Sequence, residues 1–167
     1  MIFFVDAMLG HIAKKLRLLG FDSEYFSDID DSKLIEKAHT ECRTIISRDY
    51  SLIQRAKKKG ISIVYVSKED EFEQFLEILK ITGLEIKKIS GDTARCTKCN
   101  AETFRIDKSE IKNPIPPLVL EQNDLFWKCE KCSQIYWEGT HIKNLQKFFD
   151  DLKQTYDHNS RKISKNI

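Results

Sequence analysis

The first ninety residues alternate between two kinds of hydrophobic pattern. Short apolar runs typical of buried strands are separated by stretches of about ten residues with apolar side chains at helical spacing. The clearest helix pattern covers 71–82, where Phe72, Phe75, Leu76 and Leu79 recur at i, i+3, i+4 and i+7. We predict strands at 2–6, 21–26, 44–47 and 61–66, and helices at 8–19, 31–41, 50–59 and 71–82. Helices that connect short strands form crossovers, so this part is predicted to be α/β with a mainly parallel sheet.

The pattern changes after Gly91, where helical spacing disappears. Short β-like pieces follow at 104–106, 118–120, 126–127 and 135–137. The segment Asn113-Pro-Ile-Pro-Pro117 excludes regular structure, so we expect a loop there. One further amphipathic helix is predicted at 142–156, and the polar residues from 157 to 167 are expected to fray into solvent. The chain therefore divides into three parts, 1–91, 92–141 and 142–167.

Composition and charge narrow the class of protein. The 167 residues are 41% hydrophobic, which is enough for an ordinary core, and 28 Lys and Arg against 26 Asp and Glu give a net charge of +2. This balance excludes a histone-like polycation and an acidic disordered chain. No apolar run reaches the ~18 residues of a membrane helix, so no membrane association is expected. The start at Met1 lacks a basic region and a small-residue cleavage site, so we expect no signal peptide and a cytoplasmic protein.

Four of the five cysteines form two CxxC pairs. Cys96-Thr-Lys-Cys99 and Cys129-Glu-Lys-Cys132 are separated by 29 residues. Zinc takes four tetrahedral thiolates, and two CxxC turns complete that shell without an open position for water, which predicts a structural zinc site. A redox-active CxxC pair is the alternative. Cys42 follows the apolar side of a predicted helix and is expected to lie in the core.

Aspartates follow or precede several predicted elements. Asp6 ends the first strand, Asp49 follows the strand 44–47, and Asp30 and Asp31 precede the second helix. Because the carboxyl ends of parallel strands share one edge, these acids are candidates for a hard-oxygen site that binds Mg²⁺ or Mn²⁺ and cleaves phosphodiesters. Aspartate is also a preferred helix N-cap, and spacing alone does not separate the two roles.

Basic and aromatic residues accompany these two candidate sites. Lys14, Arg17 and Arg48 lie near the acids in the predicted fold, as expected for a polyanionic substrate, although a solvated helix face has the same pattern. His141 is a candidate polar contact or the start of the last helix. In the cysteine-containing part, basic residues alternate with aromatic ones, which suits single-stranded RNA but also suits a small core that needs covering. The residues are Arg95, Lys98, Arg105, Lys128, Lys131, Phe126, Trp127, Tyr136 and Trp137.

Six segments carry a family resemblance. They are Val5-Asp-Ala-Met-Leu-Gly10, Leu16-Arg-Leu-Leu-Gly20, Arg43-Thr-Ile-Ile-Ser-Arg-Asp49, Cys96-x-x-Cys-Asn100, Cys129-x-x-Cys132 and Tyr136-Trp-x-Gly-Thr-His141. In this order, over about residues 2–152, they resemble the mut-seven C-terminal RNase domain family of PIN-like nucleases with a zinc ribbon. Small departures from the family pattern occur at His11, Lys15, Ser47 and Thr140, and none removes an acid or a cysteine.

The resemblance implies a fold and an activity. The expected fold is a PIN-like three-layer α/β sandwich at 1–91, a small zinc ribbon at 92–141, and a C-terminal helix with a basic flexible tail at 142–167. The expected activity is metal-dependent hydrolysis of RNA that leaves a 5′-phosphate. Asp6, Asp31 and Asp49 would hold Mg²⁺ or Mn²⁺, with Glu69 or Asp70 as candidates for a fourth acid.

Two hypotheses for function follow. In the first, the protein is a ribonuclease in which Lys14, Arg17, Arg48 and His141 contact RNA and a structural zinc shapes the ribbon. Ribosomal and transfer RNA are candidate substrates. In the second, the protein is a non-catalytic RNA- or ribosome-binding module in which the aspartates only cap helices. An inhibitor-controlled, toxin-like nuclease would differ from the first hypothesis in its biology alone.

Overall fold

Four parallel strands form the main sheet. The computed structural model describes the backbone of residues 1–112 and 114–164 and the side chains of 1–112 and 114–159. The strand order is β2-β1-β3-β4, with β1 at Ile2–Val5, β2 at Asp22–Tyr25, β3 at Thr44–Ser47 and β4 at Ile63–Tyr65. All neighbouring pairs are parallel. The predicted α/β architecture with a parallel sheet is confirmed.

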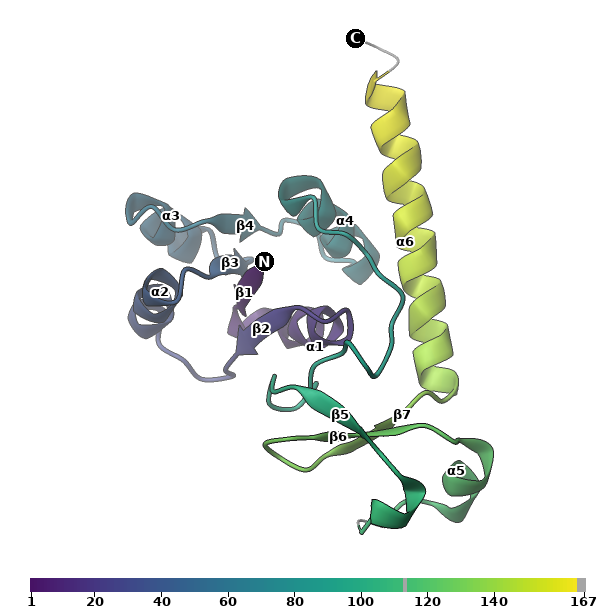
Figure 1. Cartoon of the computed structure of the whole chain (residues 1–167). Coiled ribbons are helices and arrows are strands. Elements are labelled where there is room, and N and C mark those ends of the chain that lie inside the picture. The colour runs from purple at the N-terminus through teal and green to yellow at the C-terminus, as the bar shows by residue number, and fades with distance from the viewer. Residues whose placement is uncertain (113, 165–167) are drawn as a thin grey trace.

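Helices cover both faces of this sheet and make three layers (Figure 1). They are η1 at Ala7–Leu9, α1 at Gly10–Leu18, α2 at Asp31–Thr40, α3 at Tyr50–Lys58 and α4 at Glu71–Thr82. Alternate side chains of β1 point to opposite faces of the sheet. Phe3 and Val5 pack into the core beneath α1 and α4, whereas Phe4 packs against α2 and α3. This is the sandwich that the resemblance implies.

Three of the helices end in the same turn. Gly20, Cys42 and Gly60 follow α1, α2 and α3 with positive φ angles of 90°, 54° and 73°. In each case the next residue donates its N–H to a carbonyl of the last helical turn, as Arg43 does to Ala38 at 2.8 Å. Cys42 therefore occupies a position that favours glycine, at the exposed end of a helix. The prediction of a buried Cys42 was wrong, because the turn carries the side chain away from the apolar side of α2.

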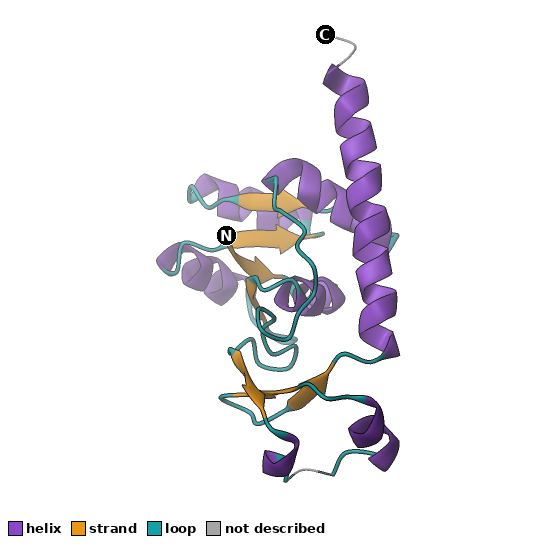
Figure 2. Cartoon of the chain, turned by 45° about the vertical axis from the view of Figure 1, so that its right-hand side comes forward, coloured by secondary structure: helices purple, strands orange, loops and turns teal. Residues whose placement is uncertain are grey.

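The second unit is a small antiparallel sheet that lies below the first (Figure 2). Its strands, in the order β5-β6-β7, are Thr103–Ile106, Phe126–Cys129 and Ile135–Trp137. Between β5 and β6 lie η2 at Lys108–Glu110 and α5 at Pro117–Gln122. The β-like piece predicted at 118–120 was wrong, since the two prolines before it start a helix with Pro117 at its first position. Within the expected loop, Asn113 lies outside the described residues.

The last helix, α6, runs from Thr140 to Ser164 beside α4. Leu145, Phe149 and Leu152 are buried in the core of the main sheet, and the rings of Phe75 and Phe149 meet edge to face at 5.5 Å. The helix is longer than the predicted 142–156, because residues 157–164 contain no glycine or proline to end it. The rest of the expected tail, 165–167, lies outside the described residues. Among the described helices, none is long and apolar enough to cross a membrane.

Candidate functional site

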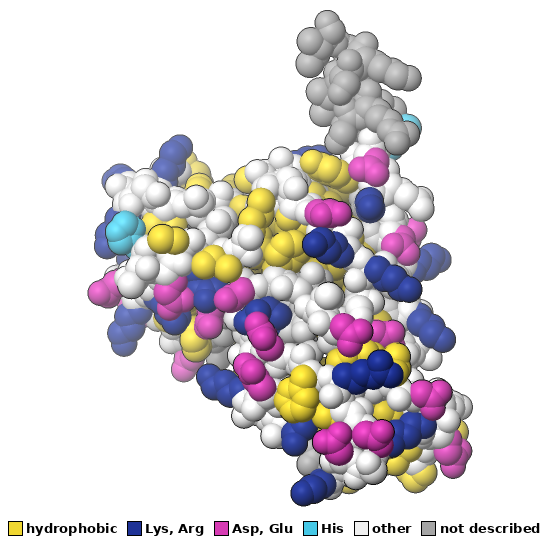
Figure 3. Space-filling model, in the orientation of Figure 1, with side chains coloured by type: hydrophobic (Ala, Val, Ile, Leu, Met, Phe, Trp, Pro, Cys, Tyr) yellow, Lys and Arg dark blue, Asp and Glu magenta, His cyan; other side chains and the backbone are white. Residues whose placement is uncertain are grey.

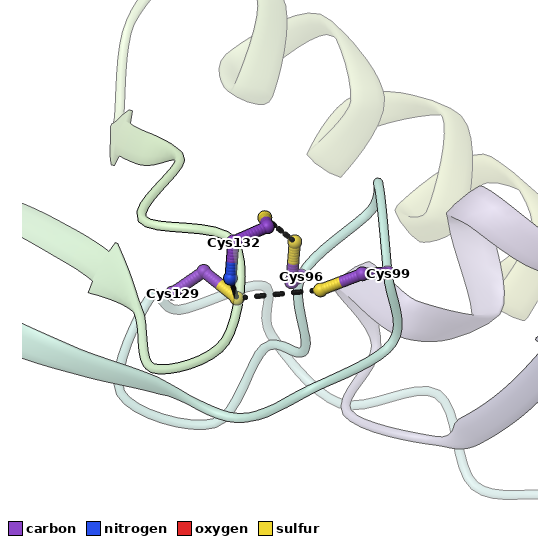
Figure 4. Close-up of side chains that lie close together, drawn as sticks. All are labelled: Cys96, Cys99, Cys129 and Cys132. Atoms are coloured by element: carbon purple, nitrogen blue, oxygen red, sulfur yellow. Dashed lines mark hydrogen bonds between the residues drawn. The ribbon is translucent and has the colours of Figure 1, made fainter.

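The four paired cysteines converge on one point (Figure 4). Their Sγ atoms all lie within 4.8 Å of one another. The Sγ atoms of Cys96 and Cys132 are 3.5 Å apart, and those of Cys99 and Cys129 are 3.4 Å apart. Four sulfurs at ~2.3 Å from a tetrahedral zinc ion would be about 3.8 Å from each other. The cluster therefore fits zinc in both ligand type and spacing.

Each CxxC pair is folded back by the residue after it. Asn100 and Ser133 have positive φ angles of 67° and 58°, and their N–H groups donate to the carbonyls of Cys96 and Cys129. The N–H of Cys132 also donates to Cys129 Sγ at 3.4 Å. These turns aim both thiols of a pair in one direction, which is what a shared metal ion requires.

The two thiols of the first CxxC pair have pKa values shifted in opposite directions. Burial disfavours the Cys96 thiolate, yet hydrogen bonds from the Tyr136 hydroxyl and from backbone N–H groups outweigh it and lower the pKa of Cys96 to about 6. Burial, with a contribution from the neighbouring Cys129 thiol, raises the pKa of Cys99 to about 12. Four adjacent thiolates repel one another, so full ionisation needs a metal ion. With all four positions filled by protein, such an ion is structural.

Arg17 and Asn100 attach this cluster to the main sheet. Arg17 is only 4% exposed, and its Nε and Nη1 donate to the carbonyls of Ser23 and Thr97 at 2.8 and 2.9 Å. Asn100 accepts from the N–H of Ser23 at 3.0 Å and donates to Asp22 Oδ1 at 2.8 Å. Burial lowers the pKa of the Arg17 guanidinium, against the attraction of Glu24 and of the cysteines. Arg17, a candidate RNA contact by sequence, thus lies in the interior and joins the two units.

A second candidate site lies at the carboxyl edge of the main sheet. In the main sheet, β2 lies on one side of β1 and β3 lies on the other. The direction in which the chain adds strands therefore reverses between β1 and β3. Ligands of open α/β sheets bind at such a switch point. Asp6 follows β1 and Asp49 follows β3. The Ser47 hydroxyl donates to Asp6 Oδ2 at 2.6 Å and accepts from the Asp49 N–H at 2.9 Å, which links the two acids.

The aspartates divide between capping and other roles. Asp49 Oδ1 caps α3 by accepting from the N–H groups of Ser51 and Leu52 at 2.7 and 3.1 Å. Asp30 and Asp70 cap α2 and α4 in the same way. Asp6 precedes η1 without a side-chain cap. The capping interpretation therefore holds for Asp49, Asp30 and Asp70 but does not account for Asp6.

Asp31 has a different partner from Asp6 and Asp49. It sits in the first turn of α2, where its Oδ2 forms an ion pair with Arg55 Nη1 at 3.0 Å. Among the described residues, only the four cysteines bring three or more ligand groups together. The three acids do not form such a group.

Asp6 and Asp49 still suit a hard divalent cation. Oδ1 of Asp6 and Oδ2 of Asp49 make no hydrogen bond within the described part of the chain. Magnesium is commonly held by one or two carboxylates, several waters and the phosphates of its substrate. Asp6 and Asp49 each offer one carboxylate oxygen of this kind.

The predicted cationic contacts have different surroundings. Lys14 is exposed on α1 and has no ion pair among the described residues, whereas Arg48 pairs with the exposed Glu69. His141 is exposed in the first turn of α6 and lines a shallow cavity with Trp137. On the face shown in Figure 3, basic and acidic side chains are interspersed. Any binding of a polyanion therefore depends on local contacts.

The aromatic residues of the ribbon are largely structural. Phe126 and Trp127 are buried, and Tyr136 and Trp137 are half-buried. Trp127 covers Gly91, where a Cβ would lie 2.1 Å from the indole, and donates to Asp92 at 2.7 Å. The interpretation of these rings as a core covering is thus correct for Phe126 and Trp127.

Sequence reasoning missed the linking roles of Ser47 and Asn100. Ser47 was noted only as a departure from the family pattern, although its place two residues before Asp49 at a strand end is a usable signal. Asn100, directly after a CxxC pair, indicates a left-handed turn. Its bonds to Ser23 and Asp22 cross 77 and 78 residues of sequence and leave no local signal.

Comparison with known proteins gives one match. A family model described as the Mut7-C RNAse domain matches residues 1–149. No curated protein and no solved structure matches the chain.

Proposed function

The chain belongs to the Mut7-C RNase domain family, and from that premise we propose that it is a ribonuclease that uses Mg²⁺ or Mn²⁺ at Asp6 and Asp49. The observation that carries the proposal is the Ser47 hydroxyl at the switch point of the sheet, which bonds to the Asp6 carboxylate and to the main-chain N–H of Asp49. Helix capping does not require Asp6, so its placement there calls for another role.

Asp6 and Asp49 would each contribute a carboxylate oxygen to the cation. Ser47 fixes the orientation of Asp6 through Oδ2 and leaves Oδ1 free. The cap on α3 fixes Asp49 through Oδ1 and leaves Oδ2 free. A bound Mg²⁺ or Mn²⁺ would supply an activated water and neutralise charge on the phosphodiester transition state.

Asp31 and the basic side chains complete the proposed site. Asp31 would contribute once its ion pair with Arg55 opens, and both side chains of that pair are more than two-fifths exposed, at 43% and 44%. Lys14 and Arg48 would contact phosphates, and His141 would contact RNA at the ribbon side. Arg17 would act by holding the ribbon in place. The product would carry a 5′-phosphate, as the family resemblance implies.

The ribbon would present RNA to this edge. Lys98, Arg105 and Lys131 are exposed on it, and the 48% exposed Phe104 is paired across the strands with Lys128. Cations and an exposed ring on one small unit suit single-stranded RNA, whose bases stack and whose phosphates need neutralising. Zinc would keep these residues in position without taking part in cleavage.

One observation favours a second function. Asp49 caps α3 and Asp31 is paired with Arg55, so two of the three expected acids have structural roles already. A non-catalytic RNA- or ribosome-binding module would have the same contacts. It differs in its response to divalent metal, because binding through basic residues does not need Mg²⁺ or Mn²⁺.

The test is cleavage of labelled RNA by zinc-loaded protein with and without Mn²⁺. Asp6→Asn keeps an acceptor for Ser47 but removes the charge, and should lower cleavage at least about 100-fold, consistent with loss of a metal ligand. Asp30→Asn is the matched control, since asparagine caps α2 as well as aspartate does, and it should cleave like the unmodified protein. Metal-independent binding without cleavage by every form would support the binding module instead.

A further inference from the structure

Large exposed apolar side chains follow each strand of the main sheet at its carboxyl end. Met8 lies after β1 and is 70% exposed, and Phe26 comes directly after β2 and is 42% exposed. Tyr50, the first residue of α3 after β3, is 63% exposed, and Tyr65 ends β4 and is 37% exposed. Single exposed apolar residues are ordinary, whereas exposed apolar residues that contact one another mark a binding surface.

Tyr50 and Tyr65 form a defined pair within this row. Their ring centroids are 5.8 Å apart and the rings meet at 78°, edge to face. Tyr65 is the register partner of Ser47 in the pairing of β3 with β4. Tyr50 directly follows Asp49 in the chain. The ring pair is thus adjacent to the serine that links Asp6 and Asp49.

We propose that the Tyr50–Tyr65 pair stacks a base of single-stranded RNA beside the acidic edge. The edge-to-face contact holds each ring while the high exposure of Tyr50 leaves ring surface open to a base. A base in a duplex has both faces covered by its neighbours, so the site selects single strands. Stacking on a ring is available to every base, so we expect weak sequence preference.

The charges around the pair agree with a polyanionic ligand. Arg48 precedes Asp49, and its partner Glu69 is 84% exposed and free to move aside. Lys68 is exposed in the loop that follows β4. A base on the tyrosines would place its backbone within reach of Arg48 and of Asp6 and Asp49. This inference rests on the proposed function and names the form of RNA that the site takes.

The experiment measures binding apart from cleavage. A 2′-O-methyl RNA strand with one 2-aminopurine is titrated into zinc-loaded protein, and fluorescence quenching reports stacking of the base. The same strand in a duplex is the competitor. Tyr50→Ala should weaken single-strand binding about 5- to 100-fold, the range expected for one lost stacking contact. Tyr50→Phe keeps the ring and should restore most of that loss.

Two further variants make the result specific. Ile81→Ala, at a 55% exposed position near the end of α4, should bind as the unmodified protein does. Tyr65→Ala should weaken binding as Tyr50→Ala does. Unchanged affinity and quenching in both tyrosine variants, with the thermal midpoint retained, would overturn the inference, and so would equal affinity for single strands and duplex.

The outcome is separable from that of the proposed function. Asp6→Asn removes no ring, so the stacked base should still be quenched when this variant is saturated with the modified strand. Stacking without metal-dependent cleavage of ordinary RNA would leave the inference standing and overturn the nuclease. Cleavage that depends on Asp6 but not on Tyr50 would support the nuclease and overturn the inference.

Discussion

Replacing Arg17 by methionine should destabilise the protein by about 3–6 kcal/mol. Arg17 makes charge-assisted hydrogen bonds to the Ser23 and Thr97 carbonyls at 2.8 and 2.9 Å in a buried environment. Each such bond contributes roughly 1.5–3 kcal/mol, and methionine would leave both carbonyls without that donor. Since whole domains are stable by only about 5–15 kcal/mol, the loss is large. Arg17→Lys keeps the charge but cannot reproduce the two-pronged geometry, so it should recover only part of the loss.

The assay is urea unfolding read by two signals. Trp127 and Trp137 are the two tryptophans of the chain and both lie in the ribbon strands, so their emission reports that unit. Far-UV circular dichroism reports the helices of the main sheet. In Arg17→Met, the ribbon signal should change first, because the Thr97 carbonyl belongs to the turn between Cys96 and Cys99.

Lys14→Met is the matched control on the same helix. Lys14 is exposed and has no ion pair among the described residues, so its loss should change stability by no more than about 0.5 kcal/mol. If Lys14 contacts a phosphate, RNA binding should weaken, and the slope of the logarithm of the binding constant against the logarithm of the salt concentration should fall by about one. An Arg17→Met protein as stable as the unmodified one, yet weaker in RNA binding, would refute the interior role of Arg17.

Two other predictions concern the zinc ribbon and a buried ion pair. Removing zinc with a strong chelator should shift the tryptophan emission to the red and leave most helical signal intact, because the ribbon's own apolar cluster has a core of three buried residues. Unchanged emission after verified zinc loss would contradict a structural zinc. Partial burial raises the pKa of Asp22, but hydrogen bonds from Arg43 and Asn100 outweigh it and lower the pKa. The ionised Asp22 therefore stabilises the folded protein fully above about pH 4, and this contribution to stability is lost as the pH falls through the lowered pKa. Arg43→Met removes the ion pairs of Arg43 with both Asp22 and Glu41, so it should cost about 3 kcal/mol at pH 7 and less at pH 3, as measured by urea unfolding at both values. An equal cost at both pH values would exclude these two pairs as its source.

Local pattern predicts the main sheet well because its helices bury one side and its strands, covered on both faces, are short apolar runs. The strand 44–47 and the helix pattern at 71–82 match the structure to the residue, since apolar spacing alone sets their burial. The segment 118–120 is apolar enough for a strand, but Pro116 and Pro117 start a helix there. In such a small unit, backbone preference outweighs hydrophobic pattern.

Tertiary placement is what the pattern could not predict. Arg17 resembles a solvent-exposed helix residue, and its burial depends on Thr97, 80 residues away. The cysteine site follows from spacing, because two CxxC turns have few other uses. Whether an aspartate caps a helix or faces a metal ion depends on one side-chain rotation. Asp6 caps no helix, and its hydrogen bond comes from Ser47, 41 residues further along the chain.

The central claim is that Asp6 and Asp49 hold a divalent cation at the sheet edge. The most direct measurement is Mn²⁺ binding to zinc-loaded protein by electron paramagnetic resonance, with a 2′-O-methyl RNA strand present to supply phosphate oxygens. It does not depend on having found the right RNA to cleave. The account predicts one bound Mn²⁺ that is lost in Asp6→Asn and kept in Asp30→Asn. Mn²⁺ binding that is absent, or equal in both variants, would contradict it.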